Sequence, residues 1–537
     1  MLETDVRRAQ RAILAAFALL AVLFSGAFPP FSNPNELSRF ETVVAAVEHS
    51  TFAIDAVMAE LGGHEDKAVA NGRIYSNKAP GLALAAIPVY RLLRCVLPEP
   101  VTANADPIFR LMRLFTVSLV SLFALFRFGR RLASWTNPQT APLVLCAAAL
   151  GTPYLFYSRT FFSHSWTAAL LFLSWDALAG GDEAATDIPR GRLWAAGFLA
   201  GWAAISEYTV APVALLLAIR VLADRPRRRV LHFVLGAAVP LIVLGIYDTV
   251  CFGAPWVLSS AREADPLYSQ LARTGLFGFG APRADVALAY LVHPARGLLV
   301  FSPFLGWCIP GFARWWRSAT RRADCGLALA ATAVYFVAMA GYPNWHGGWT
   351  LGSRYLLPVL FFPAMAIGFA LRTALSRGLF VAAVAFSVAG QFVLTATFPH
   401  FPDNVSWPVA TGSLWFLERG WFAPGLLDRL PHGGLAAVAL SGVAFAVPLA
   451  LSIRTAGIVR PRGAIAVLLG LAPLALLLLR PPELSFGARL WRSAIYGAYS
   501  GRDSNREELR AVVVTAATPA EERQAAGAWR LYGPPRP

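Results

Sequence analysis

Long apolar runs separated by short charged loops cover most of this chain, and they predict a bundle of membrane-spanning helices. A helix needs about 20 mostly apolar residues to cross a bilayer. Runs of about this length lie near 11–28, 107–127, 140–157, 163–180, 230–251, 297–314, 324–341, 354–371, 378–396, 435–452 and 463–480. The pattern therefore predicts an all-α polytopic membrane protein.

Two further apolar runs depart from this pattern. The run 191–222 carries a glutamate in its middle and arginines at both ends, which predicts a hairpin of two short helices that turns at Glu207 and Tyr208. The run 81–97 is interrupted by Pro88 and two arginines, so we expect an interfacial helix on the outer face. Together these assignments predict about 13 transmembrane helices, with juxtamembrane helices in the first outer loop.

The charged residues set the expected orientation. Only 15% of the residues are charged and 56% are hydrophobic, with a mean hydropathy of +0.53, whereas soluble domains carry roughly 25% charged residues. The net charge of +16 comes largely from arginines in short loops, as is typical of the cytoplasmic side. We therefore expect a multi-pass protein of the cell membrane with a cytoplasmic amino terminus and an extracytoplasmic carboxyl terminus. We expect no nucleic-acid partner.

The chain divides into three sections. Residues 1–371 form the first membrane module, which includes the outer loop 29–106. Residues 372–480 add further transmembrane helices, and residues 481–537 form an extracytoplasmic tail. The five cysteines are scattered without metal-like spacing.

The first outer loop opens with an acidic and basic segment, Asn35-Glu36-Leu37-Ser38-Arg39. Charge at the edge of a bilayer is costly and usually functional. Apolar positions at helical spacing over 37–54 predict an amphipathic helix on the membrane that points Glu36 toward the boundary of protein and bilayer. The alternative is that Glu36 only caps this helix, where a carboxylate is favourable by roughly 0.3–1 kcal/mol. The spacing supports both interpretations equally.

The same loop carries further charged and aromatic candidates: Asp66, Lys67, Tyr75 and Lys78. Basic residues on the outer side need an anionic partner, which is a lipid headgroup, a carboxylate or a bound phosphate. For Lys78 we favour a ligand phosphate, because Pro80 and Gly81 fix the turn that follows it.

Further candidates lie at the outer ends of later helices. Arg159 and His164 occupy a predicted outer turn, where His164 taken alone is better explained as a satisfied turn histidine. Glu207, beside Tyr208, must face a cavity or a charged partner because it interrupts an apolar run. A salt bridge to an outer arginine explains it equally well.

Two segments near the middle of the chain combine glycine with arginine. Arg296 precedes one predicted span, and the segment 345–355 contains His346, Arg354 and Tyr355 among tryptophans and glycines. An interfacial aromatic belt explains the tryptophans, but it does not explain the glycines and Arg354 together. The guanidinium of Arg354 has the fork geometry that suits a phosphate.

These motifs resemble those of the polytopic glycosyltransferases of the C superfamily, most closely the lipid-A aminoarabinose transferases and more distantly the protein O-mannosyltransferases. That family carries an acidic D-E-x-R motif after the first span and a Lys-Pro motif before the next. Residues 35–39 match the first motif, and residues 77–80 match the second. The leading aspartate of the family is Asn35 here, and the family commonly has a lysine where this chain has Glu207. The resemblance covers about residues 1–370.

The resemblance implies a glycosyltransferase that uses a polyprenyl-phosphate sugar and inverts the anomeric centre in one displacement at the extracytoplasmic face. The acceptor is a lipid, a glycan or a protein hydroxyl. Glu36 or Asp66 would deprotonate the acceptor, and Lys78 and Arg354 would stabilise the leaving phosphate. Arg39, Lys67, Tyr75, Arg159, His164, Glu207, Tyr208, Arg296, His346 and Tyr355 are the other expected substrate-binding residues. A metal is not required for this chemistry, although a divalent cation is compatible with it.

Two other functions are open at this stage. A transporter or flippase of a lipid-linked or anionic solute would also place basic residues beside a membrane cavity. It would spread charged residues along a path through the membrane, however, whereas here they gather at one face. A catalytically silent scaffold with this fold is the third hypothesis, and Asn35 favours it.

Overall fold

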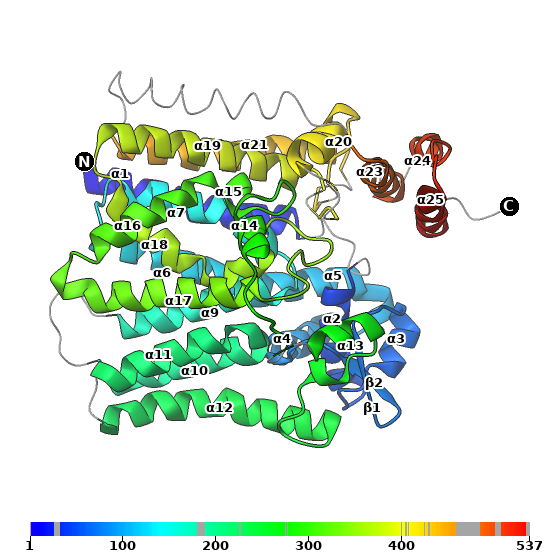
Figure 1. Cartoon of the computed structure of the whole chain (residues 1–537), viewed down its shortest axis with the longest axis horizontal. Coiled ribbons are helices and arrows are strands. Elements are labelled where there is room, and N and C mark those ends of the chain that lie inside the picture. The colour runs from blue at the N-terminus through cyan, green and yellow to red at the C-terminus, as the bar shows by residue number, and fades with distance from the viewer. Residues whose placement is uncertain are drawn as a thin grey trace.

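The computed structural model describes residues 2–25, 33–179, 188–224, 227–273, 275, 278–398, 400–402, 405, 407–423, 425–427, 430–457, 484–499 and 506–532. Most of these residues form helices that lie side by side in stacked layers (Figure 1). The predicted span near 463–480 lies outside the described residues.

The amino-terminal part forms one long helix followed by a compact group of short elements. These are α1 (Leu2–Leu23), α2 (Pro34–Glu48), α3 (Asp55–Leu61), β1 (Lys67–Ala70), β2 (Arg73–Ser76), α4 (Gly81–Val96) and α5 (Val101–Arg113). A helical bundle follows: α6 (Leu119–Trp135), α7 (Ala141–Leu150), α8 (Tyr154–Ser158), α9 (Ser163–Leu178), α10 (Arg190–Ser206), α11 (Ala211–Asp224) and α12 (Arg227–Phe252).

The remainder of the bundle contains α13 (Pro266–Ala272), α14 (Ala284–Val292), α15 (Leu298–Phe301), α16 (Cys308–Trp315), α17 (Arg322–Ala340), α18 (Phe361–Ala370), α19 (Ala374–Ala396), α20 (Leu414–Glu418) and α21 (Gly433–Thr455). The described tail residues form α23 (Phe486–Tyr499), α24 (Arg506–Val513) and α25 (Pro519–Tyr532).

Five helices are long and apolar enough to cross a membrane, so the protein is a membrane protein. They cover Val101–Trp135, Val230–Phe252, Ala319–Ala340, Ala374–Ala396 and Gly433–Thr455 among the described residues. The predicted number of about 13 spans is not confirmed, because several predicted spans are broken. The run 140–157 divides into α7 and α8, and the run 297–314 divides at Pro303 into α15 and α16. Proline interrupts a helix because it lacks an N–H donor and clashes with the preceding turn.

The segments predicted to be outer gather at one end of the bundle. Helices α2, α3 and α13 and the strands lie there together, and the carboxyl-terminal helices extend from the same side (Figure 1). Helix α2 does not lie on the bundle as the expected surface helix. Residues 36–45 of α2 are all buried, and α2 packs against α4.

A short β-hairpin within this group is the exception to the predicted all-α class. Strands β1 and β2 pair antiparallel, with Lys67 opposite Ser76 and Ala70 opposite Arg73. The turn residues Asn71 and Gly72 both have positive φ, at 52° and 73°. Asn-Gly is favoured in two-residue hairpin turns because it tolerates this conformation. The hairpin thus brings the residues on either side of it close together.

The predicted hairpin of two short helices is present as α10 and α11. Helix α10 ends at Ser206, and a short 3₁₀ turn over Tyr208–Val210 leads into α11. Helices α10 and α12 then pack with their backbones in close approach. A Cβ on Gly197 would lie 1.9 Å from the carbonyl oxygen of Phe233. Small residues permit this kind of helix packing in membranes.

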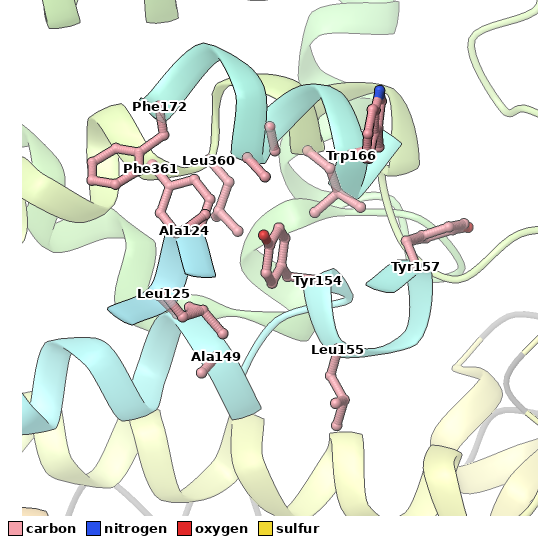
Figure 2. Close-up of a cluster of buried hydrophobic side chains, with 14 of the residues drawn as sticks. Ala124, Leu125, Ala149, Tyr154, Leu155, Tyr157, Trp166, Phe172, Leu360 and Phe361 are labelled. Carbon is pink, nitrogen blue, oxygen red and sulfur yellow. The ribbon is translucent and has the colours of Figure 1, made fainter. Parts of the chain in front are cut away.

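The centre of the bundle is a cluster of aromatic and aliphatic side chains. Tyr154, Phe172 and Phe361 come from different elements and converge there (Figure 2). The Phe361 ring centroid lies 5.1 Å from that of Tyr154 and 4.9 Å from that of Phe172. This close packing fixes the positions of α8, α9 and α18 relative to one another. The start of α9, at Ser163 and His164, contributes to the site described next.

Candidate functional site

The β-hairpin places an acid and a base in direct contact. Asp66 precedes β1 and Lys78 follows β2, and the Lys78 Nζ lies 2.9 Å from Asp66 Oδ1. The Asn77 amide donates to Asp66 Oδ1 at 3.4 Å and to Glu263 Oε2 at 2.7 Å. The loop that carries Glu263 is held in place because the Ala264 N–H donates to the carbonyl of Lys67 at 3.0 Å.

The two carboxylates of this corner differ in their pKa. Burial opposes the ionisation of Asp66, but the charge and hydrogen bond of Lys78, together with the Asn77 amide, hold its pKa below the usual range. For Glu263 burial is the larger effect, and it raises the pKa although Asn77 and Lys78 oppose it. Asp66 is therefore the carboxylate that stays ionised most readily.

Arg39 links this corner to the start of α9. Helix α2 begins at Pro34 because the Asn33 side chain caps it, accepting from the Asn35 N–H at 3.0 Å. One turn later, Arg39 Nη1 donates to the carbonyl of Asn35 at 2.8 Å, and Nη2 donates to Ser163 Oγ at 3.2 Å. The negative charges of Glu207 and Asp66 both act on Arg39.

Glu207 lies at the break between α10 and α11, and it turns back toward α9. Its Oε2 accepts from Ser163 Oγ at 2.6 Å and lies 3.7 Å from His164 Nδ1. The Thr209 hydroxyl is 3.4 Å from Oε1. Glu207 therefore has polar partners on both oxygens, as expected for a carboxylate that interrupts an apolar run.

Arg354 lies against aromatic rings rather than against a carboxylate. Its guanidinium lies 5.3 Å from the centroid of Phe162 and 5.0 Å from that of Tyr355, and Nη2 donates to the Tyr355 hydroxyl at 3.3 Å. No carboxylate of the described residues lies within 4.0 Å of it, and its buried Nε has no hydrogen-bond partner among them. The charge of Asp66 acts on it from further away.

Seven residues from five chain segments form this site, which we call the polar cluster: Arg39, Asp66, Lys78, His164, Glu207, Arg354 and Tyr355. All seven residues are among the candidates predicted from the sequence. Three permanent cations and two carboxylates are brought together there, and among the described residues only Lys78 of these cations has a carboxylate within 4.0 Å. Such an arrangement can hold an anion beside a carboxylate that accepts protons.

Glu36 is not part of the polar cluster. We expected it at the edge of the bilayer as a catalytic base, but its side chain is buried. Its Oε2 pairs with Arg113 Nη2 at 2.5 Å, and its Oε1 accepts from the Phe161 N–H. Both side chains of the pair are only 1% exposed. Because both oxygens are bound inside the protein, Glu36 joins α2 to α5 and to the loop between α8 and α9 rather than facing a substrate.

Arg296 and His346 belong to the framework. The Arg296 guanidinium donates to five backbone carbonyls, those of Ala295, His346, Gly348, Thr350 and Phe401, at 2.8–3.2 Å. His346 Nδ1 accepts from the Gly348 N–H at 3.1 Å. Arg296, which was expected to bind substrate, thus holds the loop before Arg354 in shape.

The other expected residues lie apart from the polar cluster or at its rim. Tyr75 packs on Phe252 with ring centroids 5.5 Å apart, and Lys67 lies in β1. Tyr208 opens the turn after Glu207. Arg159 is buried, with its guanidinium near the rings of Phe24 and Phe156, and its nitrogens have no hydrogen-bond partner among the described residues.

Three polar partners of the cluster were not predicted: Asn77, Ser163 and Glu263. Asn77 is adjacent to Lys78, so the Lys-Pro motif itself was the available signal. Glu263 meets Asn77 across 186 residues of chain, and its sequence surroundings carry no motif. Within the described part of the chain, no group of three or more His, Cys, Asp or Glu side chains is arranged to hold a metal ion.

The sequence matches no protein-family model and no curated protein. Among solved structures, the chain is similar to the crystal structure of ArnT from Cupriavidus metallidurans bound to undecaprenyl phosphate, with a TM-score of 0.46 and 16% identity over 85% of this chain and 77% of that chain. ArnT from the same organism in the apo state gives a TM-score of 0.43 at 16% identity, covering 86% and 76%. The likeness is distant.

Proposed function

We propose that the protein is a membrane glycosyltransferase, which moves a sugar from a polyprenyl-phosphate donor to an acceptor hydroxyl at the extracytoplasmic face. The donor class follows the resemblance of the two sequence motifs. The observation that carries the proposal is the Asp66–Lys78 ion pair at 2.9 Å in one cluster with Arg354, a cation without a carboxylate partner among the described residues.

The proposed reaction is a single displacement at the anomeric carbon. The acceptor oxygen forms a bond to this carbon, and the bond between the carbon and the phosphate oxygen breaks. The acceptor proton passes to Asp66. The Asp66 Oδ1 accepts from the Lys78 ammonium and the Asn77 amide, whereas Oδ2 has no hydrogen-bond donor among the described residues. Arg354 and Lys78 stabilise the charge on the leaving phosphate, because donors placed where charge develops lower the barrier.

Asp66 is preferred to Glu36 as the base. A general base must come within about 2.6–3.2 Å of the proton it removes, and a carboxylate with both oxygens bound in the interior cannot do so. Asp66 retains some contact with solvent, with a side chain that is 19% exposed. The absence of the family aspartate at Asn35 is then compatible with catalysis.

The test compares Asp66→Asn with Glu65→Gln, its exposed neighbour, which loses a carboxylate in the same way. Purified variants in nanodiscs receive a panel of undecaprenyl-phosphate-linked sugars with a radiolabelled sugar, together with a membrane lipid extract. We expect Asp66→Asn to reduce transfer by about 10²–10⁴-fold and Glu65→Gln to leave it unchanged.

Equal activity in both variants would remove Asp66 from the mechanism. Movement of intact labelled donor across proteoliposomes, without transfer to any acceptor, would replace the proposal with a transporter or flippase. A wild-type protein that binds the donor but neither transfers nor moves it would indicate a silent scaffold.

A further inference from the structure

A large apolar groove runs along the bundle beside the polar cluster. It has a volume of about 750 Å³ and lies between α4, α6, α9 and α10. Figure 1 shows α9 between α6 and α10, and both pairs are in contact. Most of its lining is aliphatic or aromatic: Ala85, Leu119, Val120, Phe123, Trp166, Leu170, Leu173, Phe198, Leu199 and Trp202.

The two ends of the groove differ in chemistry. At one end Trp202 Nε1 donates to the carbonyl of Gly81 and Trp166 Nε1 donates to Ser206 Oγ, both at 3.0 Å. This end reaches the start of α4, next to the polar cluster. The other end is lined by Arg127, Asp176 and Arg192. Ten residues of α9 separate Trp166 from Asp176, which corresponds to about 15 Å along a helix.

The charged end contains more cations than anions. Arg127 donates to Asp176 Oδ2 through Nε at 2.8 Å and Nη2 at 2.6 Å, and Arg131 donates to Oδ1 at 2.7 Å. Arg192 donates to the backbone carbonyls of Asp176 and Ala179 at 3.2 and 3.3 Å. Two guanidinium groups thus share the one carboxylate that lines the described groove, and Arg192 donates only to backbone carbonyls. Excess positive charge remains where the groove ends.

We propose that this groove binds an anionic glycerophospholipid, with its phosphate on Arg127 and Arg192 and an acyl chain along the apolar wall. Arginine pairs with phosphate through two parallel hydrogen bonds, and basic pockets between membrane helices recognise anionic headgroups. Arg127 is suited to this role because its side chain is 33% exposed although it holds Asp176. The site is separate from the proposed donor site, because Ser163, at the polar cluster, and Asp176 lie about 20 Å apart along α9.

A prenyl chain that enters from the polar cluster is the competing occupant, and it fits less well. Its hydrocarbon would end against Arg127 and Arg192 and would remove water from their guanidinium groups without supplying an anion. Such uncompensated burial of charge is unfavourable. A phospholipid places charge against charge and hydrocarbon against hydrocarbon along the whole groove.

The experiment uses the full chain in detergent with equal amounts of phosphatidylglycerol and phosphatidylcholine, and native mass spectrometry measures the lipid retained. The variant Arg127→Gln/Arg192→Gln removes both proposed contacts. The matched control is Arg130→Gln, on the same helix, whose exposed side chain lies over Phe126 and outside the groove. Val120→Trp fills the apolar wall and leaves every arginine in place.

We expect the wild type and Arg130→Gln to prefer phosphatidylglycerol. In the double variant this preference should fall about 30-fold, because each arginine near a lipid headgroup contributes about 1 kcal/mol to binding. Val120→Trp should retain less of both lipids, and it tests the groove independently if the double variant fails to fold. Equal retention of the two lipids by the wild type would overturn the proposal. So would an unchanged preference in the double variant, or displacement of the bound lipid by undecaprenyl phosphate alone.

Discussion

Replacement of Glu36 by glutamine separates a structural role from a catalytic one. Glu36 and Arg113 form an ion pair in which both side chains are 1% exposed, and the Glu36 carboxylate also accepts from the Phe161 N–H. Glu36→Gln keeps the shape and an oxygen for Phe161. It removes the negative charge that balances Arg113, so the Arg113 guanidinium is left buried without an ion pair.

The size of the effect follows from the burial of this pair. Loss of one partner from a buried ion pair costs about 3–5 kcal/mol, because the other charge stays buried without compensation. Arg113 keeps its hydrogen bond to the Ser25 carbonyl at 3.0 Å and its place 4.1 Å from the Phe109 ring centroid. We therefore expect the lower end, about 3 kcal/mol, which is a factor of about 150 in the unfolding equilibrium.

The assay is denaturation of the protein in mixed micelles, with sugar transfer measured on the folded fraction. The control is Glu3→Gln, which breaks an exposed ion pair with Arg7 on α1 and should leave the midpoint unchanged. The double variant Glu36→Leu/Arg113→Met should recover most of the loss, because apolar residues of similar volume replace buried ion pairs without large cost.

A particular outcome would refute this reasoning. If Glu36→Gln unfolds at the same denaturant concentration as the wild type but loses all transfer, Glu36 acts in the reaction and not in the framework. The expected result is the reverse, with a lowered midpoint and normal transfer by each folded molecule.

Three further changes test the site and its framework. Lys78→Met removes the ammonium that lowers the pKa of Asp66. In a plot of transfer rate against pH, the rise on the acidic side should therefore move to higher pH, and an unchanged profile would contradict Asp66 as the base. Gly81→Ala places a Cβ 2.7 Å from the backbone nitrogen of Ser206. It should destabilise the protein by about 1–3 kcal/mol and lower the denaturation midpoint, whereas an unchanged midpoint would show that α4 can shift. Arg296→Gln leaves buried carbonyls unpaired at about 1–3 kcal/mol each and should open the 346–350 loop to proteolysis, whereas wild-type cleavage rates would contradict its framework role.

Local features of the sequence predicted much of the fold and pointed to the seven residues that the structure brings together in the polar cluster. The apolar runs predicted helices because the length and hydrophobicity of a segment are visible in that segment alone. The break at Glu207 was predicted for the same reason. Asn71-Gly72 is also typical of a two-residue hairpin turn, but the all-α prediction did not include a hairpin. The motif residues Lys78 and Arg354 are both in the polar cluster.

The tertiary structure alone decided which carboxylate is available for chemistry. Glu36 and Asp66 are both acidic residues of one loop, and their sequence surroundings do not distinguish them. Arg113 meets Glu36 across 77 residues of chain, whereas Asp66 meets Lys78 at the open end of a short hairpin. Whether a carboxylate is buried in an ion pair or left with a free oxygen depends on which distant segments fold against it. Its charge and reactivity are therefore properties of the packed bundle.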